Sequence, residues 1–473
     1  MIRIHNTLTG HLEDFKPMHD RTVHMFVCGP TVYDLIHIGN ARTFVAFDMV
    51  AKYLRYRGYD VTYIQNITDI ENRIIDRAAQ TKEDPLAYAR RFEEEFYKDA
   101  SALGISSITQ YVRATDHIDA IIHQVQRLLD TGHAYQIGDG IYFDTSTFPD
   151  YGKLSGRTTV QADDAVSRID ENPEKRNPGD FVLWKRALPD GGSREPTWDS
   201  PWFKGRPGWH IEDTAITETF FGPQYDLHGG GRDLIFPHHE AEIAQQESAA
   251  GKKPFVRFWL HAGFLVTNKE KMGKSLGNFT YARDILANYP KETVRLYFLG
   301  AHLRSPLEFS EDGLHQAEAG IMRIAEFLER LRFYEETNPL AHRTDRQIAE
   351  EIAHIHDRVL EAMDDDFNAP KAIGLLFDLI RMGNQYLDAN MIDMHSAARL
   401  LNALDLFDHV MGIIPKKTAA LNHEIQELAN QREQARKKGD FTRADTLRDE
   451  IQKRGWHIDD TPYGPLVKKS KQQ

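Results

Sequence analysis

The fold is decided by the stretch Phe26-Val-Cys-Gly-Pro-Thr-Val-Tyr-Asp-Leu-Ile-His-Ile-Gly-Asn-Ala-Arg42. It begins inside a buried strand-like run, residues 22–28, which ends at a Gly-Pro turn. Apolar residues at helical spacing follow from 41 to 57, and a second strand-like run covers 59–65. Strand, helix and strand in this order predict a parallel βαβ unit and therefore an α/β fold.

Working outward from this unit, the sequence divides into five parts. Residues 1–120 and 196–310 both alternate strand and helix patterns, and we expect them to form two halves of one parallel sheet. Residues 121–195, with more turns and a short strand, are expected to be an insertion between the halves. Residues 311–414 have an almost wholly helical pattern, which predicts a helical bundle. The remainder, 415–473, predicts a small C-terminal domain with a helix-turn-helix and a mixed tail.

Composition excludes several classes of protein. Of the 473 residues, 41% are hydrophobic and 27% charged, which is typical of globular domains and not of disordered, collagen-like or coiled-coil chains. The single cysteine rules out an internal disulfide framework. No apolar run approaches the roughly 20 residues that span a bilayer, so no membrane partner is expected. The first residues lack an apolar signal core, which predicts a cytoplasmic location.

Charge is distributed unevenly along the chain. The net charge of −13 argues against a protein that coats nucleic acid. Residues 416–473, however, hold 13 Lys and Arg against 9 Asp and Glu. This basic end could contact a phosphate backbone, or it could be an ordinary solvated helical surface.

Two segments have the residues of a phosphate site. His37, Gly39 and Asn40 stand where a helix opens, and free backbone N–H groups at a helix start bind anions. Lys271 and Lys274 flank a glycine in a cationic loop that could neutralise a departing pyrophosphate. Taken singly, the first is more often a structural cap and the second a surface loop.

A metal-binding pattern lies in Phe236-Pro-His-His-Glu-Ala-Glu242. His238 and Glu242 are four residues apart on an expected helix, so both could reach one cation. The alternative is an exposed His–Glu pair.

The two phosphate-site segments together resemble those of the class I aminoacyl-tRNA synthetases, and further stretches are similar to the cysteinyl-tRNA synthetase family. The resemblance covers almost the whole chain. Its stretches are Cys28–Tyr33, Asn66–Ile70, Lys175–Trp184, Arg206–Glu212, His228–Asp233, Phe236–Glu242, Met363–Pro370 and Ala435–Arg448.

The resemblance implies a Rossmann-like catalytic domain and an anticodon-binding-like domain at 415–473. It implies activation of L-cysteine with Mg²⁺-bound ATP, then transfer of the aminoacyl group to a cysteine-isoacceptor tRNA. The catalytic residues that it implies are His37, Asn40, Lys271 and Lys274. The ATP-binding residues that it implies are Gly39, Gly229, Gly230 and Lys274. The residues that it implies for binding the amino acid are Thr68, Trp209, His228 and Asp233.

The resemblance also implies one Zn²⁺, held by Cys28, Asp213, His238 and Glu242. Asp213 stands where the family has a cysteine, which keeps the ligand charge but makes the site less thiophilic. Asn40 replaces the second histidine of the ATP signature, and Gly273 replaces a serine of the mobile loop. Val467 stands where the family tends to have a tryptophan that would stack on an anticodon base.

Two alternatives remain open from the sequence. A diverged paralogue would activate cysteine or another amino acid and pass it to an acceptor other than tRNA. A catalytically silent tRNA-binding protein would keep only the fold, although retention of both phosphate sites argues against it.

Overall fold

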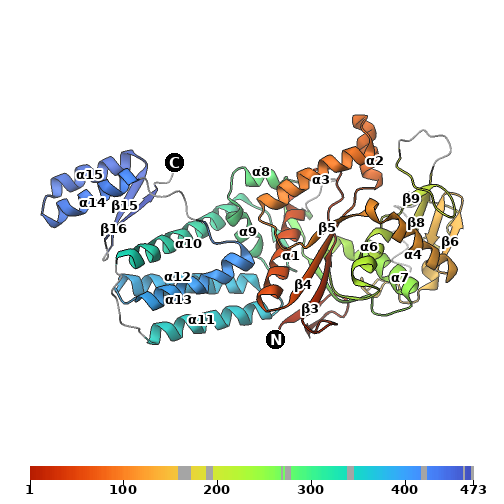
Figure 1. Ribbon diagram of the computed structural model, residues 1–473, viewed down its shortest axis with the longest axis horizontal. Helices are drawn as coiled ribbons and strands as arrows, with labels where there is room; N and C mark the ends of the chain where they lie inside the picture. The colour runs from red at the N-terminus through yellow and green to blue at the C-terminus, as the bar shows by residue number, and fades with distance from the viewer. Residues whose placement is uncertain are drawn as a thin grey trace. The chain divides into compact units, whose positions relative to one another are not determined.

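The chain is described by a computed structural model (Figure 1). The described residues are 1–157, 172–187, 195–267, 270–271, 279–337, 346–416, 423–461 and 464–469. They belong to two compact units. Unit 1 comprises Met1–Glu311 with Met363–Ala369, and unit 2 comprises Asp312–Ala362 with Pro370–Gln473.

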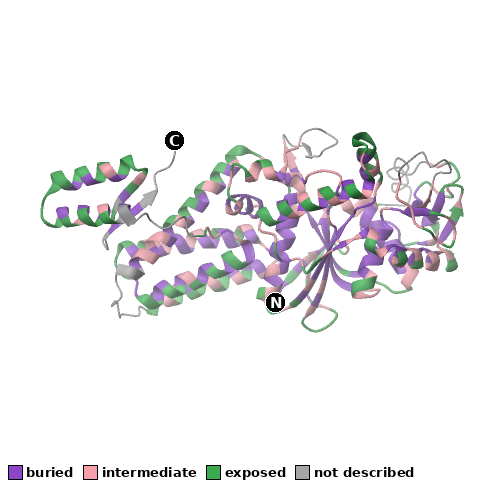
Figure 2. Cartoon of the chain, turned by 45° about the horizontal axis from the view of Figure 1, so that its top comes forward, coloured by how far each residue is buried: buried purple, intermediate pink, exposed green. Residues whose placement is uncertain are grey.

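The centre of unit 1 is a five-stranded sheet in which all pairs are parallel, in the order β11-β10-β3-β4-β5. The predicted α/β, Rossmann-like fold is therefore confirmed. Most residues of β3, β4, β10 and β11 are buried, whereas β5 is largely not (Figure 2), and the buried strands are those expected of a parallel sheet covered by helices. Their bounds are β3 Thr22–Val27, β4 Asp60–Ile67, β5 Gln110–Arg113, β10 Tyr225–Gly231 and β11 Val256–Ala262.

Strand β10 joins the two halves of the sheet. It pairs with β3 in the register Leu227↔Met25, His228↔Phe26 and Gly229↔Val27, across about 200 residues of sequence. The carboxyl ends of β3, β4 and β10 consequently lie at the same edge of the sheet, where ligands bind in open α/β sheets.

The helices of unit 1 follow the strands. Helix α1 is the crossover between β3 and β4, and most of its residues are buried. Asp48 of α1 forms a buried ion pair with Arg295 of α9 at 2.8 Å. The bounds are α1 Ile38–Tyr56, α2 Asn72–Thr81, α3 Pro85–Ala102, α4 Ile118–Asp130, α6 Ile211–Phe221, α7 Glu240–Ala250, α8 Ala282–Leu286 and α9 Lys291–Leu299.

The expected insertion contains a four-stranded antiparallel sheet, in the order β6-β7-β8-β9. Phe143, Phe181 and Trp184 of this sheet are fully buried in its core. The fourth strand lies past residue 195, the end of the segment expected to form the insertion. The bounds are β6 Ala134–Ile137, β7 Gly140–Phe143, β8 Phe181–Arg186 and β9 Gly205–Pro207.

Short elements complete unit 1. The hairpin of β1 (Arg3–Asn6) and β2 (His11–Asp14) opens the chain. A small sheet contains β12 (Leu265–Thr267), β13 (Glu270–Lys271) and β14 (Leu307–Glu308).

Segment 363–369 belongs to unit 1 through polar contacts. The Tyr53 hydroxyl donates to Asp364 at 2.7 Å, and the Arg304 guanidinium donates to Asp366 at 2.7 Å.

Unit 2 is mainly helical, as the pattern over 311–414 predicted. A small core in its last part contains Ile425, Ala429, Ile451, Ile458 and Val467. No helix among the described residues has both the length and the apolar character needed to cross a membrane. The bounds are α10 Glu311–Thr337, α11 Arg346–Asp364, α12 Ala369–Asp388, α13 Met394–Leu406, α14 His423–Lys437, α15 Phe441–Lys453, β15 Trp456–Thr461 and β16 Gly464–Lys469.

Packing of α1 on β10 requires a glycine at position 229. A Cβ atom there would overlap the ring of Phe47. We expect Gly229→Ala to lower the free energy of unfolding of unit 1 by about 1–3 kcal/mol, because the core is overpacked. The measurement is denaturant unfolding followed by tryptophan fluorescence, since five of the six tryptophans lie in unit 1.

The matched control is the same substitution combined with Phe47→Leu. The double variant should be more stable than the sum of the two single losses predicts, by about 1 kcal/mol. Strictly additive losses would show that the ring is not the reason for the glycine.

Candidate active site and metal centre

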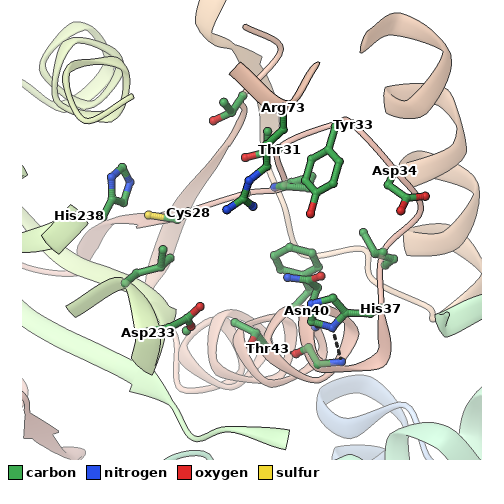
Figure 3. A pocket seen from close by; sticks show the side chains of 18 of the residues that line it. Cys28, Thr31, Tyr33, Asp34, His37, Asn40, Thr43, Arg73, Asp233 and His238 are labelled. Carbon is green, nitrogen blue, oxygen red and sulfur yellow. Dashed lines mark hydrogen bonds between the residues drawn. The ribbon is translucent and has the colours of Figure 1, made fainter. Parts of the chain in front are cut away.

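A cavity of about 800 Å³ opens at the carboxyl ends of β3, β4 and β10, within unit 1. Cys28 and His238 lie at one end of it, and His37 and Asn40 lie at the other (Figure 3). Residues far apart in the sequence therefore share one cavity, as the crossover topology requires.

Gly29 shapes the edge of this cavity. It lies two residues past the end of β3, and a Cβ atom at this position would overlap the backbone carbonyl of Asn66, near the end of the neighbouring strand. The glycine of the Gly-Pro turn is thus required by the close approach of two strand ends.

Four side chains converge at the Cys28 end of the cavity. The Cys28 sulfur lies 3.3 Å from Oδ2 of Asp213, which is in the first turn of α6. The same oxygen lies 3.0 Å from Nε2 of His238, and this nitrogen lies 3.1 Å from Oε1 of Glu242 on α7. The four ligand atoms all lie within 4.8 Å of one another, close enough to bind a single ion.

The electrostatics of this cluster favour a bound cation. Burial, followed by the nearby Asp213 and Glu242, raises the pKa of the Cys28 thiol well above its usual value. Burial and Asp213 likewise raise the pKa of Glu242. Both Glu242 oxygens are buried without a hydrogen-bond partner among the described residues. A metal ion would neutralise the acidic groups and satisfy these oxygens, so the donor set fits a metal.

Two buried histidines lie behind Cys28. Nε2 of His239 is 3.1 Å, and Nε2 of His228 is 3.4 Å, from the sulfur. Burial lowers the pKa of both rings, so they are neutral. With Cys28 and Glu242 they form a second group of possible ligands. Neither histidine lines the cavity, whereas Cys28, Asp213 and His238 of the first group do, so the first group is the more accessible of the two from the cavity.

Three of the four residues expected to bind the amino acid line the cavity, and the fourth is buried behind it. Thr68, Trp209 and Asp233 line the cavity. The Trp209 ring stacks on the His238 ring, with 4.2 Å between centroids. His228 is fully buried behind Cys28, with the Tyr225 hydroxyl 2.6 Å from its Nδ1.

Only some of the residues expected to bind ATP line the cavity. Gly39 and Asn40 line the cavity, as does His37. Gly229 and Gly230 lie within β10, and Cβ atoms there would meet Phe47 and His239. The close approach that these two glycines allow is therefore to protein side chains.

His37 caps α1, which was the structural alternative raised by the sequence. Its Nδ1 accepts hydrogen bonds from the backbone N–H groups of Gly39, at 3.0 Å, and of Asn40, at 3.3 Å. Because backbone N–H groups can only donate, Nδ1 has no proton, and the proton of the neutral ring is on Nε2. The ring can therefore cap the helix and donate a hydrogen bond from its other nitrogen.

The cationic loop is only partly described. Lys271 ends β13, with its backbone opposite Val266. Lys274 lies outside the described residues, as does the rest of 272–278.

Sequence reasoning assigned no role to Asn66, Arg73 or Arg77, three polar residues of the cavity wall. Asn66 contacts Asp213 and Thr68, and its position in Asn-Ile-Thr-Asp at the end of a strand was the available signal. Arg73 and Arg77 line the cavity from α2. Their spacing of four residues places them on one helix face, but exposed arginine pairs are too common for that spacing to indicate a site.

Comparisons with known proteins identify the class. A family model described as "tRNA synthetases class I (C) catalytic domain" matches residues 14–319, and one for the DALR domain matches 358–415. The solved methionyl-tRNA synthetase of Mycobacterium tuberculosis, in complex with methionyl-adenylate, is similar in fold. Its TM-score is 0.63 at 18% identity, covering 83% of this chain and 92% of that one. The fold and the family match are those of a class I aminoacyl-tRNA synthetase.

Within that class, the chain belongs to the cysteine–tRNA ligase family. The cysteine–tRNA ligase of Heliobacterium modesticaldum is 43% identical over 489 residues, covering 99% of this chain and 100% of the relative. That of Carboxydothermus hydrogenoformans is 42% identical over 468 residues, covering 98% and 99%. That of Thermococcus onnurineus is 41% identical over 481 residues, covering 99% of both.

Metal content tests the cluster directly. We expect Glu242→Gln to lose most of the metal that purified protein holds, because a neutral amide is a poor ligand and one anionic donor is removed. The matched control is Glu240→Gln on the same helix. Glu240 is equally buried but accepts hydrogen bonds from the backbone of Leu154 and Ser155, outside the cluster.

Metal would be measured by elemental analysis after dialysis. Equal metal content in both variants would contradict the ligand role of Glu242.

Proposed function

We propose that this protein is a cysteine–tRNA ligase. It would activate L-cysteine with Mg·ATP and transfer the cysteinyl group to a cysteine-isoacceptor tRNA, in the cytoplasm. The observation that carries the proposal is the cavity itself. One end of its wall has a sulfur, carboxylate and imidazole donor set, and the other has a capped helix start suited to phosphate.

The metal end would select the amino acid. A zinc ion bound by Cys28, Asp213, His238 and Glu242 would supply preference for a thiolate over a hydroxyl. Of these ligands, Cys28, Asp213 and His238 line the cavity, so a substrate side chain could approach the ion from there. The stacked Trp209 fixes the orientation of the His238 ring.

The rest of the amino acid would be bound by polar groups beside the metal. Asp233 and Thr68 line the same cavity, and the Asp233 carboxylate is suited to the substrate ammonium group. His228 would not contact the amino acid; it would support the site by packing against Cys28.

The helix start would hold the nucleotide. His37 can donate from Nε2 while Nδ1 caps α1, and Asn40 supplies a side-chain amide at the same place. Gly39 leaves the backbone open to a phosphate. Lys271 and Lys274 would neutralise charge on the departing pyrophosphate.

The reaction then needs no covalent nucleophile from the protein. The cysteine carboxylate attacks the α-phosphorus of ATP, which gives cysteinyl-adenylate and pyrophosphate. The terminal ribose hydroxyl of the tRNA next attacks the carbonyl carbon, and AMP leaves. Catalysis by this chain is positioning together with stabilisation of phosphate charge.

The tRNA would be bound in part by the basic end of the chain. Val467, at the position where the family tends to have tryptophan, is only 4% exposed and packs among Ile425, Ile451 and Ile458. It is therefore not available to stack on an anticodon base, and basic side chains of α14 and α15 are the better candidates for tRNA contacts.

Amino-acid-dependent ATP–pyrophosphate exchange tests the proposed substrate. We expect cysteine to support exchange best, with a kcat/KM for serine lower by at least about 10³-fold, because a hydroxyl is a poor metal ligand. Asp213→Cys should bind zinc more tightly and keep exchange, since a second thiolate makes the site softer.

The controls separate the alternatives. Exchange with cysteine but no charging of cysteine tRNA would support a paralogue with another acceptor. No exchange with any amino acid would support a silent tRNA-binding protein.

The two roles of His37 can be separated by a pair of substitutions. Asn is a good N-cap residue, so His37→Asn should keep stability while losing the Nε2–H donor. We expect its kcat for exchange to fall by about 10²–10³-fold. His37→Ala should lose the same activity and about 0.5–2 kcal/mol of unfolding free energy.

Thermal unfolding and exchange kinetics would be measured on both variants. Full activity of His37→Asn would mean that the ring is only a cap.

A further inference from the structure

We propose that Asn66 is a positioning residue that holds Asp213 in the orientation required of a metal ligand. This inference rests on the metal centre of the proposed function and deepens it. It concerns the carboxylate of Asp213, which has a second oxygen that a cysteine at this position would lack.

Asn66 lies at the end of β4 and makes three hydrogen bonds. Its Nδ2 donates to Oδ1 of Asp213 at 2.6 Å and to the Thr68 hydroxyl at 3.2 Å. Its Oδ1 accepts the backbone N–H of Gly29 at 2.5 Å. Both hydrogen-bonding ends of the amide are therefore used.

The backbone contact fixes which way the amide faces. The Gly29 N–H can only donate, so the Asn66 oxygen must face it. The NH₂ group then has to face Asp213 and Thr68.

The two carboxylate oxygens of Asp213 have different partners. Oδ1 is bound by Asn66, and Oδ2 faces the Cys28 sulfur at 3.3 Å and His238 Nε2 at 3.0 Å. Asn66 and Asp213 are only 2% and 1% exposed, so water does not replace the amide. The outer oxygen of a ligating carboxylate is usually hydrogen-bonded in this way.

A cysteine at position 213 could not use this contact in the same way. A thiolate has one ligand atom and no second oxygen to accept the amide N–H. The contribution of Asn66 to metal binding should therefore depend on the carboxylate, which makes the inference testable by a double-substitution cycle.

The experiment measures zinc affinity of the full-length protein by competition with a chelator. We expect Asn66→Ala to weaken zinc binding about 10–100-fold, the usual effect of losing an outer hydrogen-bond partner. In the Asp213→Cys background the same substitution should change affinity less than about threefold. The absorption spectrum of the Co²⁺-substituted protein should likewise shift only when Asp213 is present.

Two further variants guard against a general effect on folding. Asn66→Asp keeps the size and the acceptor for Gly29 but places a carboxylate against Asp213, so it too should weaken zinc binding. Thr68→Val removes the other partner of the amide and should leave zinc affinity within about threefold. Thermal unfolding shows whether each variant folds.

The outcomes are distinguishable. Equal loss of affinity in both backgrounds, or no loss in either, would overturn the role of Asn66 alone. If the unsubstituted protein binds no zinc, both the metal centre and this role are overturned.

Discussion

Parallel pairing of β10 with β3 is the interaction on which the rest of the structure depends. Cys28 follows β3, and the chain after β10 leads through the short helical segment Ile235–His239, which contains His238, into α7, which contains Glu242. Asp213 is brought to the same edge by α6, which directly precedes β10. Without this pair of strands, the four metal-site residues would belong to separate parts of the molecule.

The cluster also shows that burying several acidic groups together is unfavourable for their ionised forms. Cys28, Asp213 and Glu242 are all buried, and burial raises the pKa of the thiol and of Glu242. A cation is the direct way to stabilise such a set. The neutral histidines behind Cys28 add bulk and hydrogen-bonding capacity without adding charge. Asn66 provides the remaining hydrogen bond from the opposite side.

The fold could largely be predicted from periodicity, because strand, helix and strand over 22–67 leave few alternatives. The helical region and the final helix-turn-helix were also clear from pattern. The antiparallel sheet of the insertion was not, because its strands have four, four, six and three residues, and long connections separate β7 from β8 and β8 from β9. Strands this short contain too few alternations to define a register.

The candidate site was predictable only where neighbours in sequence are neighbours in space. The spacing of His238 and Glu242 placed them on one helix face, but nothing local joined either to Cys28 or Asp213. The roles of the glycines were even harder to predict from sequence. Gly229 and Gly230 sit in a glycine run typical of nucleotide contact, yet the space that they leave is filled by Phe47 and His239. Only the tertiary structure distinguishes those two reasons for a glycine.

The segment Met363–Ala369 has a consequence for dissecting the molecule. The chain leaves unit 1 after Glu311, returns for these seven residues, and leaves again. Tyr53 and Arg304 would each lose a carboxylate partner in a fragment that stopped at 311. A fragment that keeps these contacts must therefore extend past 366 and include α10 and α11. Unit 2 is thus built from two stretches of chain, 312–362 and 370–473, that are joined through a segment of unit 1.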